Sequence, residues 1–259
     1  LGSGSAKAYT SGLRIGAGNY NGNIDEFAVF DGDKTSLAST IYNAGVPADL
    51  TGLDGLEHWW RMGDGTRPAA DGTNNLVFDQ VNTSIGSDIA DADPFSGKWT
   101  NYTGNTVSYP SGTAVRVERP SSGGNSQGAA ADLTSGGILQ STPAAGTTLK
   151  ISFVLTTDDS DVYANIYNGS SFVQSTAGGG AKTVYLTMTG SGFVRFGNLD
   201  ASKFVELSNI SVEQVNGSPA LLTNGAALNS SVPPTFSRKS VSFDGTDDYA
   251  LVSHNSDIA

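Results

Sequence analysis

The stretch TLKISFVLTT, residues 148–157, has an apolar side chain at every second position from 149 to 155. Successive side chains of a β-strand point to opposite sides, so Leu149, Ile151, Phe153 and Leu155 share one face of an extended chain. A strand of this kind turns one face to a hydrophobic core and the other to solvent. The stretch therefore predicts a half-buried strand of an antiparallel sheet.

The same alternation recurs between residues 89 and 216, and turn signals separate its segments. It is found in GTAVRVER, DVYANIYNGSSFV, AKTVYLTMT, GFVRFGN and KFVELSNISVEQV. Seven or eight short strands with turns between them are typical of a β-sandwich or jelly roll. We therefore predict an all-β fold, with a jelly-roll β-sandwich over residues 89–216.

The composition favours the same class and argues against several functions. The 259 residues include 33 glycines, only 15% are charged, and the net charge is −11. Binding to a phosphate backbone needs clustered Lys and Arg, so we expect no nucleic-acid partner. No apolar run approaches about 18 residues, so we expect no membrane insertion. The absence of cysteine excludes disulfides and thiolate metal sites. We expect the chain to be a segment of something longer.

Two further patterns lie towards the ends of the chain. IDEFAVF, residues 24–30, follows an Asn21-Gly22 turn and precedes a short helix, for which Thr35 or Ser36 is the expected N-cap. SVSFDGTDDYALV, residues 240–252, predicts two strands around an Asp244-Gly245 turn. HWWRMGDG, residues 58–65, begins another strand, whose adjacent tryptophans point to opposite faces.

These end patterns resemble laminin G-like jelly-roll domains of the concanavalin A-like class. NGNIDEFAVF and the following helix resemble the C-terminal end of that family, whereas HWWRMGDG, LLTNGA and SVSFDGTDDYALV resemble its N-terminal strands. The resemblance implies five parts: 1–48, the C-terminal part of one laminin G-like domain; 49–57, a linker; 58–88, the first strand of a second such domain; 89–216, an inserted jelly roll; and 217–259, the truncated continuation of the second domain. We expect each incomplete sandwich to be completed by another segment or by a neighbouring subunit.

The inserted block resembles carbohydrate-binding modules of the galactose-binding-like class. Their last strand commonly reads F-x-L-D-N-I-S-V, and here FVELSNISV has Ser208 where an aspartate is common. The combination of modules resembles structural proteins of marine tailed phages. It implies a location on the virion surface or outside the cell. The implied partners are other virion or appendage subunits, neighbouring laminin G-like domains and host-surface glycan.

Aromatic side chains provide the candidate glycan ligands, because a ring face can stack on the apolar face of a sugar. If Val162, Ala164 and Ile166 point into the core, the intervening side chains share the opposite face. The candidates are Tyr163, Asn165 and Tyr167 on that face, with Trp99, Tyr102 and Tyr109 lining a cleft. The alternative is that these are ordinary strand tyrosines under another layer and that the tryptophan belongs to the core.

Carboxylates gather in three loops, at residues 88–93, 158–161 and 244–248. Calcium prefers clusters of oxygen ligands in loops that can wrap around it. The candidate calcium ligands are Asp88, Asp158, Asp159 and Asp161. The alternative for each loop is a solvated turn in which aspartate accepts hydrogen bonds from its own backbone. Apart from structural calcium, we expect no cofactor.

The sequence gives little support to catalysis. His58 and His254 are the only histidines, and no serine lies in a nucleophile elbow. We therefore predict a non-enzymatic structural or adhesive protein of a phage virion, such as a tail fibre, spike or capsid appendage, that binds host-surface glycan. One alternative is a purely structural spacer or decoration protein of a virion or extracellular filament. A second is a set of accessory modules of a secreted glycan-degrading enzyme.

Overall fold

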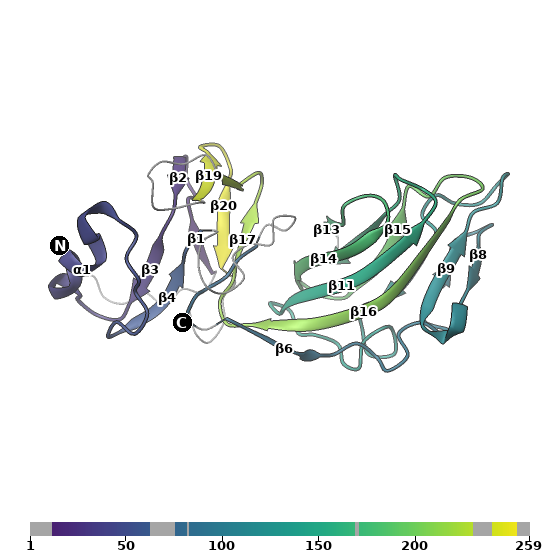
Figure 1. Cartoon of the computed structure of the whole chain (residues 1–259), viewed down its shortest axis with the longest axis horizontal. Helices are drawn as coiled ribbons and strands as arrows, with labels where there is room; N and C mark the ends of the chain where they lie inside the picture. Colours follow the sequence, from purple (N-terminus) through teal and green to yellow (C-terminus); the bar gives the residue numbers. More distant parts are fainter. Residues whose placement is uncertain (1–11, 63–75, 82, 169–170, 230–239, 253–259) are drawn as a thin grey trace. The chain divides into compact units, whose positions relative to one another are not determined.

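The computed structural model describes residues 12–62, 76–81, 83–168, 171–229 and 240–252 (Figure 1). The chain divides into two compact units. We call Leu1–Ser84 with Asn216–Ala259 the split unit, and Ile85–Val215 the inserted unit. Among the described residues, no helix has the length and hydrophobicity needed to cross a bilayer.

The inserted unit contains two antiparallel sheets. One has the order β13-β12-β15-β10-β7, and the other has the order β14-β11-β16-β9-β8, with β6 also paired to β16. The strands are β6 Ser84–Asp88, β7 Thr100–Asn101, β8 Thr106–Ser108, β9 Ala114–Glu118, β10 Ala129–Asp132, β11 Thr148–Thr157, β12 Tyr163–Asn168, β13 Ser171–Gln174, β14 Gly180–Thr187, β15 Gly192–Gly197 and β16 Phe204–Asn216, with a 3-10 turn at Pro110–Gly112. The predicted all-β class is confirmed.

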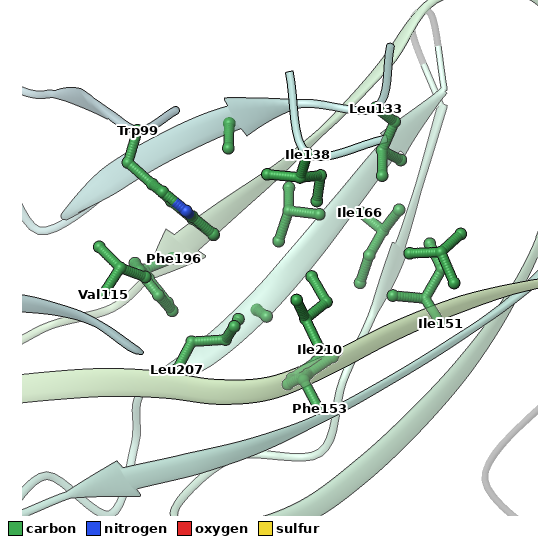
Figure 2. Packing of buried hydrophobic residues seen from close by; sticks show 14 of the residues in the cluster. Trp99, Val115, Leu133, Ile138, Ile151, Phe153, Ile166, Phe196, Leu207 and Ile210 are labelled. Atoms are coloured by element: carbon green, nitrogen blue, oxygen red, sulfur yellow. The ribbon is translucent and has the colours of Figure 1, made fainter. Parts of the chain in front are cut away.

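One hydrophobic core joins these two sheets into a sandwich. The four alternating side chains of β11 are all buried, as their spacing predicts. From the other sheet, Ile166 and Phe196 belong to the same buried cluster as Ile151 and Leu207. Figure 2 shows these four side chains converging in the space between the strands. The sandwich therefore has a hydrophobic core made by its own residues.

A β-bulge interrupts the alternation of β16. Ser152 pairs with Ser211 and Val154 with Ser208, so two residues of β16 lie opposite Phe153. One of them, Asn209, has a φ of 51°, in the left-handed region that asparagine tolerates better than most residues. A regular strand would point Leu207 and Ile210 to opposite faces, because they are three residues apart. The bulge turns both towards the core.

The described residues of the split unit form three small antiparallel sheets, with the orders β1-β20-β17-β5, β18-β19-β2 and β3-β4. Their strands are β1 Leu13–Ile15, β2 Asn21–Ile24, β3 Phe27–Phe30, β4 Leu56–Trp60, β5 Leu76–Val77, β17 Ala220–Thr223, β18 Ala227–Asn229, β19 Ser240–Asp244 and β20 Tyr249–Val252. The short helix α1, Ala38–Tyr42, lies between 3-10 turns at Thr35–Leu37 and Asn43–Gly45.

The structure joins segments that the sequence analysis assigns to two different domains. β1 pairs with β20, β2 with β19 and β3 with β4. Ile15, Trp60 and Phe243 belong to one buried cluster. Gly16, at a φ of 81°, lies so close to Phe243 that a Cβ there would stand 2.5 Å from the ring. The described residues of 1–48 and 58–88 thus share one core, and segments of the same chain pair in the same sheets. The laminin G-like assignment stays a prediction.

The N-terminus of the helical segment differs from the expectation. Neither Thr35 nor Ser36 is an N-cap, because the 3-10 turn begins at Thr35 itself and its N-cap, Lys34, makes no side-chain capping bond. Instead, Asp33 Oδ1 accepts hydrogen bonds from the backbone N–H and the hydroxyl of Thr35, at 2.9 and 2.5 Å. The carboxylate two residues earlier takes the role that was predicted for the hydroxyls.

Trp59 and Trp60 are both buried, on opposite faces of β4. Trp60 belongs to the core of the split unit. Trp59 is covered by two charged residues: its indole N–H donates to Glu26 Oε2 at 2.6 Å, and the Arg61 guanidinium lies 5.0 Å from the ring centroid. Arg61 also pairs with Glu26 at 3.0 Å. Both tryptophans therefore have structural roles.

Candidate functional site

The outer surface of the sheet that contains β12 carries the predicted tyrosines. Ala164 and Ile166 are buried in the core, so Tyr163, Asn165 and Tyr167 point outwards. Strand register adds residues from both neighbours: Tyr167 lies opposite Phe172 of β13 and Phe193 of β15, and Asn165 lies opposite Arg195 of β15. We call this set the aromatic face; its members are Tyr163, Asn165, Tyr167, Phe172, Phe193 and Arg195.

Three rings are packed together in one row of the aromatic face. Tyr167 stacks on Phe193 with centroids 4.5 Å apart and planes 9° apart, and contacts Phe172 at 5.3 Å and 35°. Phe172 is 54% exposed, whereas Tyr167 and Phe193 are half-buried. Offset ring pairs of this kind stabilise one another, so the exposed ring rests on a fixed support.

Asn165 and Arg195 form the next cross-strand pair of the aromatic face. The Arg195 guanidinium lies 4.5 Å from the Tyr167 centroid, and its terminal nitrogens donate to the Tyr167 hydroxyl and to Gln127 Oε1. Its Nε is buried and has no hydrogen-bond partner among the described residues. The cross-strand neighbour Asn165 is only 6% exposed, and its Oδ1 likewise lacks a partner. An unpaired donor and an unpaired acceptor thus occur on two residues that face each other across the strands.

Tyr163 occupies the third row. Its cross-strand partner is Gly197, and a Cβ at that glycine would stand 2.3 Å from the tyrosine ring. The ring therefore occupies the space that a side chain at position 197 would need. Like Tyr167, Tyr163 is half-buried.

The predicted cleft residues do not join this face. Trp99 is 6% exposed and stacks on the core ring of Phe196, with centroids 5.4 Å apart, which favours the alternative that this tryptophan belongs to the core. Its indole N–H is satisfied by the Pro94 carbonyl at 3.2 Å. Tyr109 is half-buried and packs against the core. Tyr102 is half-buried in the segment after β7.

The predicted calcium ligands are used as backbone acceptors. Asp88 Oδ1 accepts from the N–H groups of Ala90 and Val212, at 2.8 and 2.9 Å. Asp159 is buried and accepts from the N–H groups of Asp161 and Asp200, at 3.0 and 2.7 Å. These contacts match the alternative of aspartates that stabilise turns.

The other two aspartates of that loop also accept hydrogen bonds, one from the backbone and one from a side chain. Asp158 Oδ1 accepts from the Phe204 N–H at 2.9 Å, and Asp161 accepts from the Ser160 hydroxyl at 3.2 Å. Among the described residues, a carboxylate group with the spacing of a metal site occurs at Asp244, Asp247 and Asp248 instead.

His58 is buried in a polar contact. Its Nδ1 lies 2.7 Å from Asp79 Oδ2, while Asp79 Oδ1 accepts from the N–H groups of Trp59 and Val81, both at 3.0 Å. Both residues are almost fully buried, and His58 stacks on Trp60. This pair fixes the chain around β4. His254 lies outside the described residues.

A hollow of about 390 Å³ lies elsewhere on the inserted unit, next to β9 and the segment before β16. It is lined by Arg116, Arg119, Lys203, Glu118 and Phe204, among others. Arg116 lies 3.6 Å above the Phe204 ring and pairs with Glu118 at 2.8 Å. Its basic residues are thus largely engaged with groups of the protein itself.

Sequence reasoning missed Phe172, Phe193 and Arg195. A signal for Phe172 was available: β12 and β13 form a hairpin, and its register alone places Phe172 opposite Tyr167. Phe193 and Arg195 come from β15, far along the chain, and their alternation shows which side they face but not which strand they neighbour.

No family model matches the chain, and no curated protein matches it. Solved structures similar to part of it include the CBM22-1 xylan-binding domain of Paenibacillus barcinonensis Xyn10C, with 12% identity, 52% of this chain and 96% of that chain covered, and a TM-score of 0.32. A CBM29-2 mutant complexed with mannohexaose has 14% identity, coverage of 51% and 92%, and a TM-score of 0.32. A glycosylation-associated protein complex from Streptococcus agalactiae has 15% identity, coverage of 52% and 46%, and a TM-score of 0.33.

Proposed function

We propose that the inserted unit is a non-catalytic glycan-binding module and that the aromatic face is its binding surface. The observation that carries the proposal is the exposed Phe172 ring, supported by the stacked pair Tyr167 and Phe193. A sugar ring can stack its apolar face on such a platform. Because the three residues belong to neighbouring antiparallel strands, the platform is held in a fixed arrangement before the ligand binds.

The unpaired atoms beside the platform indicate the polar part of the ligand. A hydroxyl can donate to Asn165 Oδ1 and accept from Arg195 Nε at the same time. A carboxylate or sulfate can accept from the arginine but cannot donate to the amide oxygen. Both protein atoms lie below the surface, so a sugar hydroxyl reaches them when the arginine side chain or a tyrosine ring moves outwards. The pair therefore matches a sugar hydroxyl, which can serve both atoms at once.

The biological setting is the second part of the proposal. The sequence resemblance to marine tailed-phage proteins supports a role in a tail fibre, spike or capsid appendage that contacts host-surface glycan. Many copies on one particle would raise the apparent affinity of a weak single site. The subunits and laminin G-like domains of such an appendage would be the protein partners.

A purely structural spacer is the alternative that specific observations favour. Tyr163 and Tyr167 are partly covered by their neighbours, and Asn165 is buried, so these residues offer a ligand little surface. Trp59, Trp60 and Trp99 are all buried inside their own units. On this alternative, Phe172 packs against another subunit.

Affinity electrophoresis of the full chain in gels containing xylan, mannan, cellulose derivatives or bacterial surface polysaccharide tests the glycan proposal. We expect retardation in at least one gel. Phe172→Ala and Tyr167→Ala should weaken it about tenfold, which corresponds to roughly 1.4 kcal/mol of lost stacking. The matched control is Tyr42→Ala, because Tyr42 is 70% exposed and belongs to the split unit rather than to the aromatic face.

Free migration of the chain in every gel would contradict the proposal. An equal loss of retardation in Tyr42→Ala and Phe172→Ala would contradict the choice of binding surface. Free migration together with a Phe172-dependent oligomer in sedimentation would establish the spacer alternative. Release of reducing sugar by the purified chain would contradict the non-catalytic assignment.

A further inference from the structure

Three aspartates converge in the split unit, at the hairpin between β19 and β20. One carboxylate oxygen from each of Asp244, Asp247 and Asp248 lies within 4.8 Å of the other two. Among the described residues, no lysine, arginine or histidine forms an ion pair with any of the three. Like charges at this separation repel one another. Asp244 Oδ1 accepts from the Thr246 N–H at 2.7 Å, but no described positive charge is paired with the group.

Asp248 provides a separate observation that points to a ligand. Unlike the two exposed aspartates, it is only 6% exposed. Its Oδ2 accepts from the Asp244 N–H at 2.8 Å, but its Oδ1 is buried and has no hydrogen-bond partner among the described residues. A buried carboxylate oxygen without a partner is costly, because the group has lost its hydration and gained nothing in return.

We propose that Asp244, Asp247 and Asp248 bind a divalent cation and that the ion is calcium. Oxygens that share one calcium ion at about 2.3–2.6 Å lie no more than about 5 Å apart, which the three carboxylates satisfy. A bound cation would also supply the positive charge that these carboxylates lack. Calcium fits better than magnesium because a loop of exposed and buried carboxylates with room for water suits flexible coordination rather than a strict octahedron.

The ion would stabilise the meeting point of three segments. Asn224 donates from Nδ2 to the Asp247 carbonyl at 2.9 Å, and Asn21 donates from Nδ2 to the Asp244 carbonyl at 3.1 Å. These amides connect the acidic loop to the turn after β17 and to the start of β2. Calcium binding would therefore raise the thermal stability of the split unit rather than that of the inserted unit.

Terbium luminescence tests the site in the full chain after dialysis against EDTA. Tb³⁺ replaces calcium at oxygen sites, and Tyr249 lies next in sequence to Asp248, where it can sensitise the emission. We expect saturable emission that calcium displaces, with a dissociation constant below about 1 mM. Asp248→Asn should weaken binding at least tenfold. Asp244→Asn combined with Asp247→Asn should do the same, and as both residues are exposed, this double variant should keep the fold even if Asp248→Asn does not.

Asp158→Asn is the matched control, because Asp158 belongs to the acidic loop at 158–161 and its carboxylate already accepts from the Phe204 N–H. It should leave terbium affinity unchanged. Unsaturable emission, full affinity in the double variant, or loss of affinity in Asp158→Asn would each overturn the proposed site. Displacement by magnesium as efficient as that by calcium would overturn the choice of calcium.

Discussion

The indole N–H of Trp60 donates a 2.8 Å hydrogen bond to the backbone carbonyl of Ser218, 158 residues further along the chain. The first residue precedes the inserted unit and the second follows it. Trp60 is fully buried in the core of the split unit, which also contains Ala220 and Phe243 from beyond the insertion. The split unit thus depends on residues from both sides of the sandwich that interrupts it.

Trp60→Phe should destabilise the split unit by about 2 kcal/mol. The substitution removes the hydrogen bond to Ser218 and leaves part of the indole volume unfilled. Urea denaturation that resolves the two units should show an earlier transition for the split unit. The control is Trp99→Phe, which makes the same change in the core of the inserted unit and should move the other transition instead. Identical shifts in both variants would contradict this division.

Residues 84–216, expressed alone, should melt cooperatively. Every strand of both sheets of the sandwich lies within this fragment, as does its whole buried cluster. Differential scanning calorimetry should give one transition whose calorimetric and van't Hoff enthalpies agree. A broad, non-cooperative melt would mean that the inserted unit needs the rest of the chain.

Glu26 should make the split unit less stable as the pH rises. Burial raises the pKa of Glu26 above 4.5, although Arg61 and the Trp59 indole partly oppose this shift. Between pH 4.5 and the raised pKa, the folded state therefore binds the Glu26 proton more tightly than the unfolded state does. The resulting stabilisation is complete below pH 4.5 and is lost as the pH passes through the folded value.

Glu26→Gln provides the reference for this effect, because it cannot titrate. The unfolding free energy of the wild type minus that of the variant should fall with rising pH in this window and then level off. Urea denaturation across the pH range would measure it. A difference that increases with pH would show that the Arg61 pair, rather than burial, dominates.

The sequence predicts the sandwich well because its information is local. The alternation around Phe153 identifies both the strand and its buried face, and the structure buries that face. The bulge at Asn209 is harder to foresee, because it depends on which strand lies opposite. The pairing of β1 with β20 is not foreseeable from either segment, since each alone specifies a strand and not its neighbour.

The candidate site, too, could be predicted only as far as the residues of a single strand determine it. Tyr163, Asn165 and Tyr167 share an outward face, as their spacing requires. Their exposure, however, is decided by Arg195 and Gly197 of β15, which lie opposite them. Trp99 is buried because Phe196, a distant residue, stacks on it. The hydrogen bonds of the calcium candidates were equally out of reach, because their N–H donors include Asp200 and Phe204 from another loop.

The pairing of β6 with β16 has a consequence for how the two units fold. These strands are the first and last of the inserted unit. Its folding therefore brings together the two points at which it interrupts the split unit. An unfolded loop the length of Ile85–Val215 would cost on the order of 4 kcal/mol in chain entropy to close. A folded insertion removes most of that cost. Each unit therefore favours the folding of the other through the chain itself, and no contact between them is required.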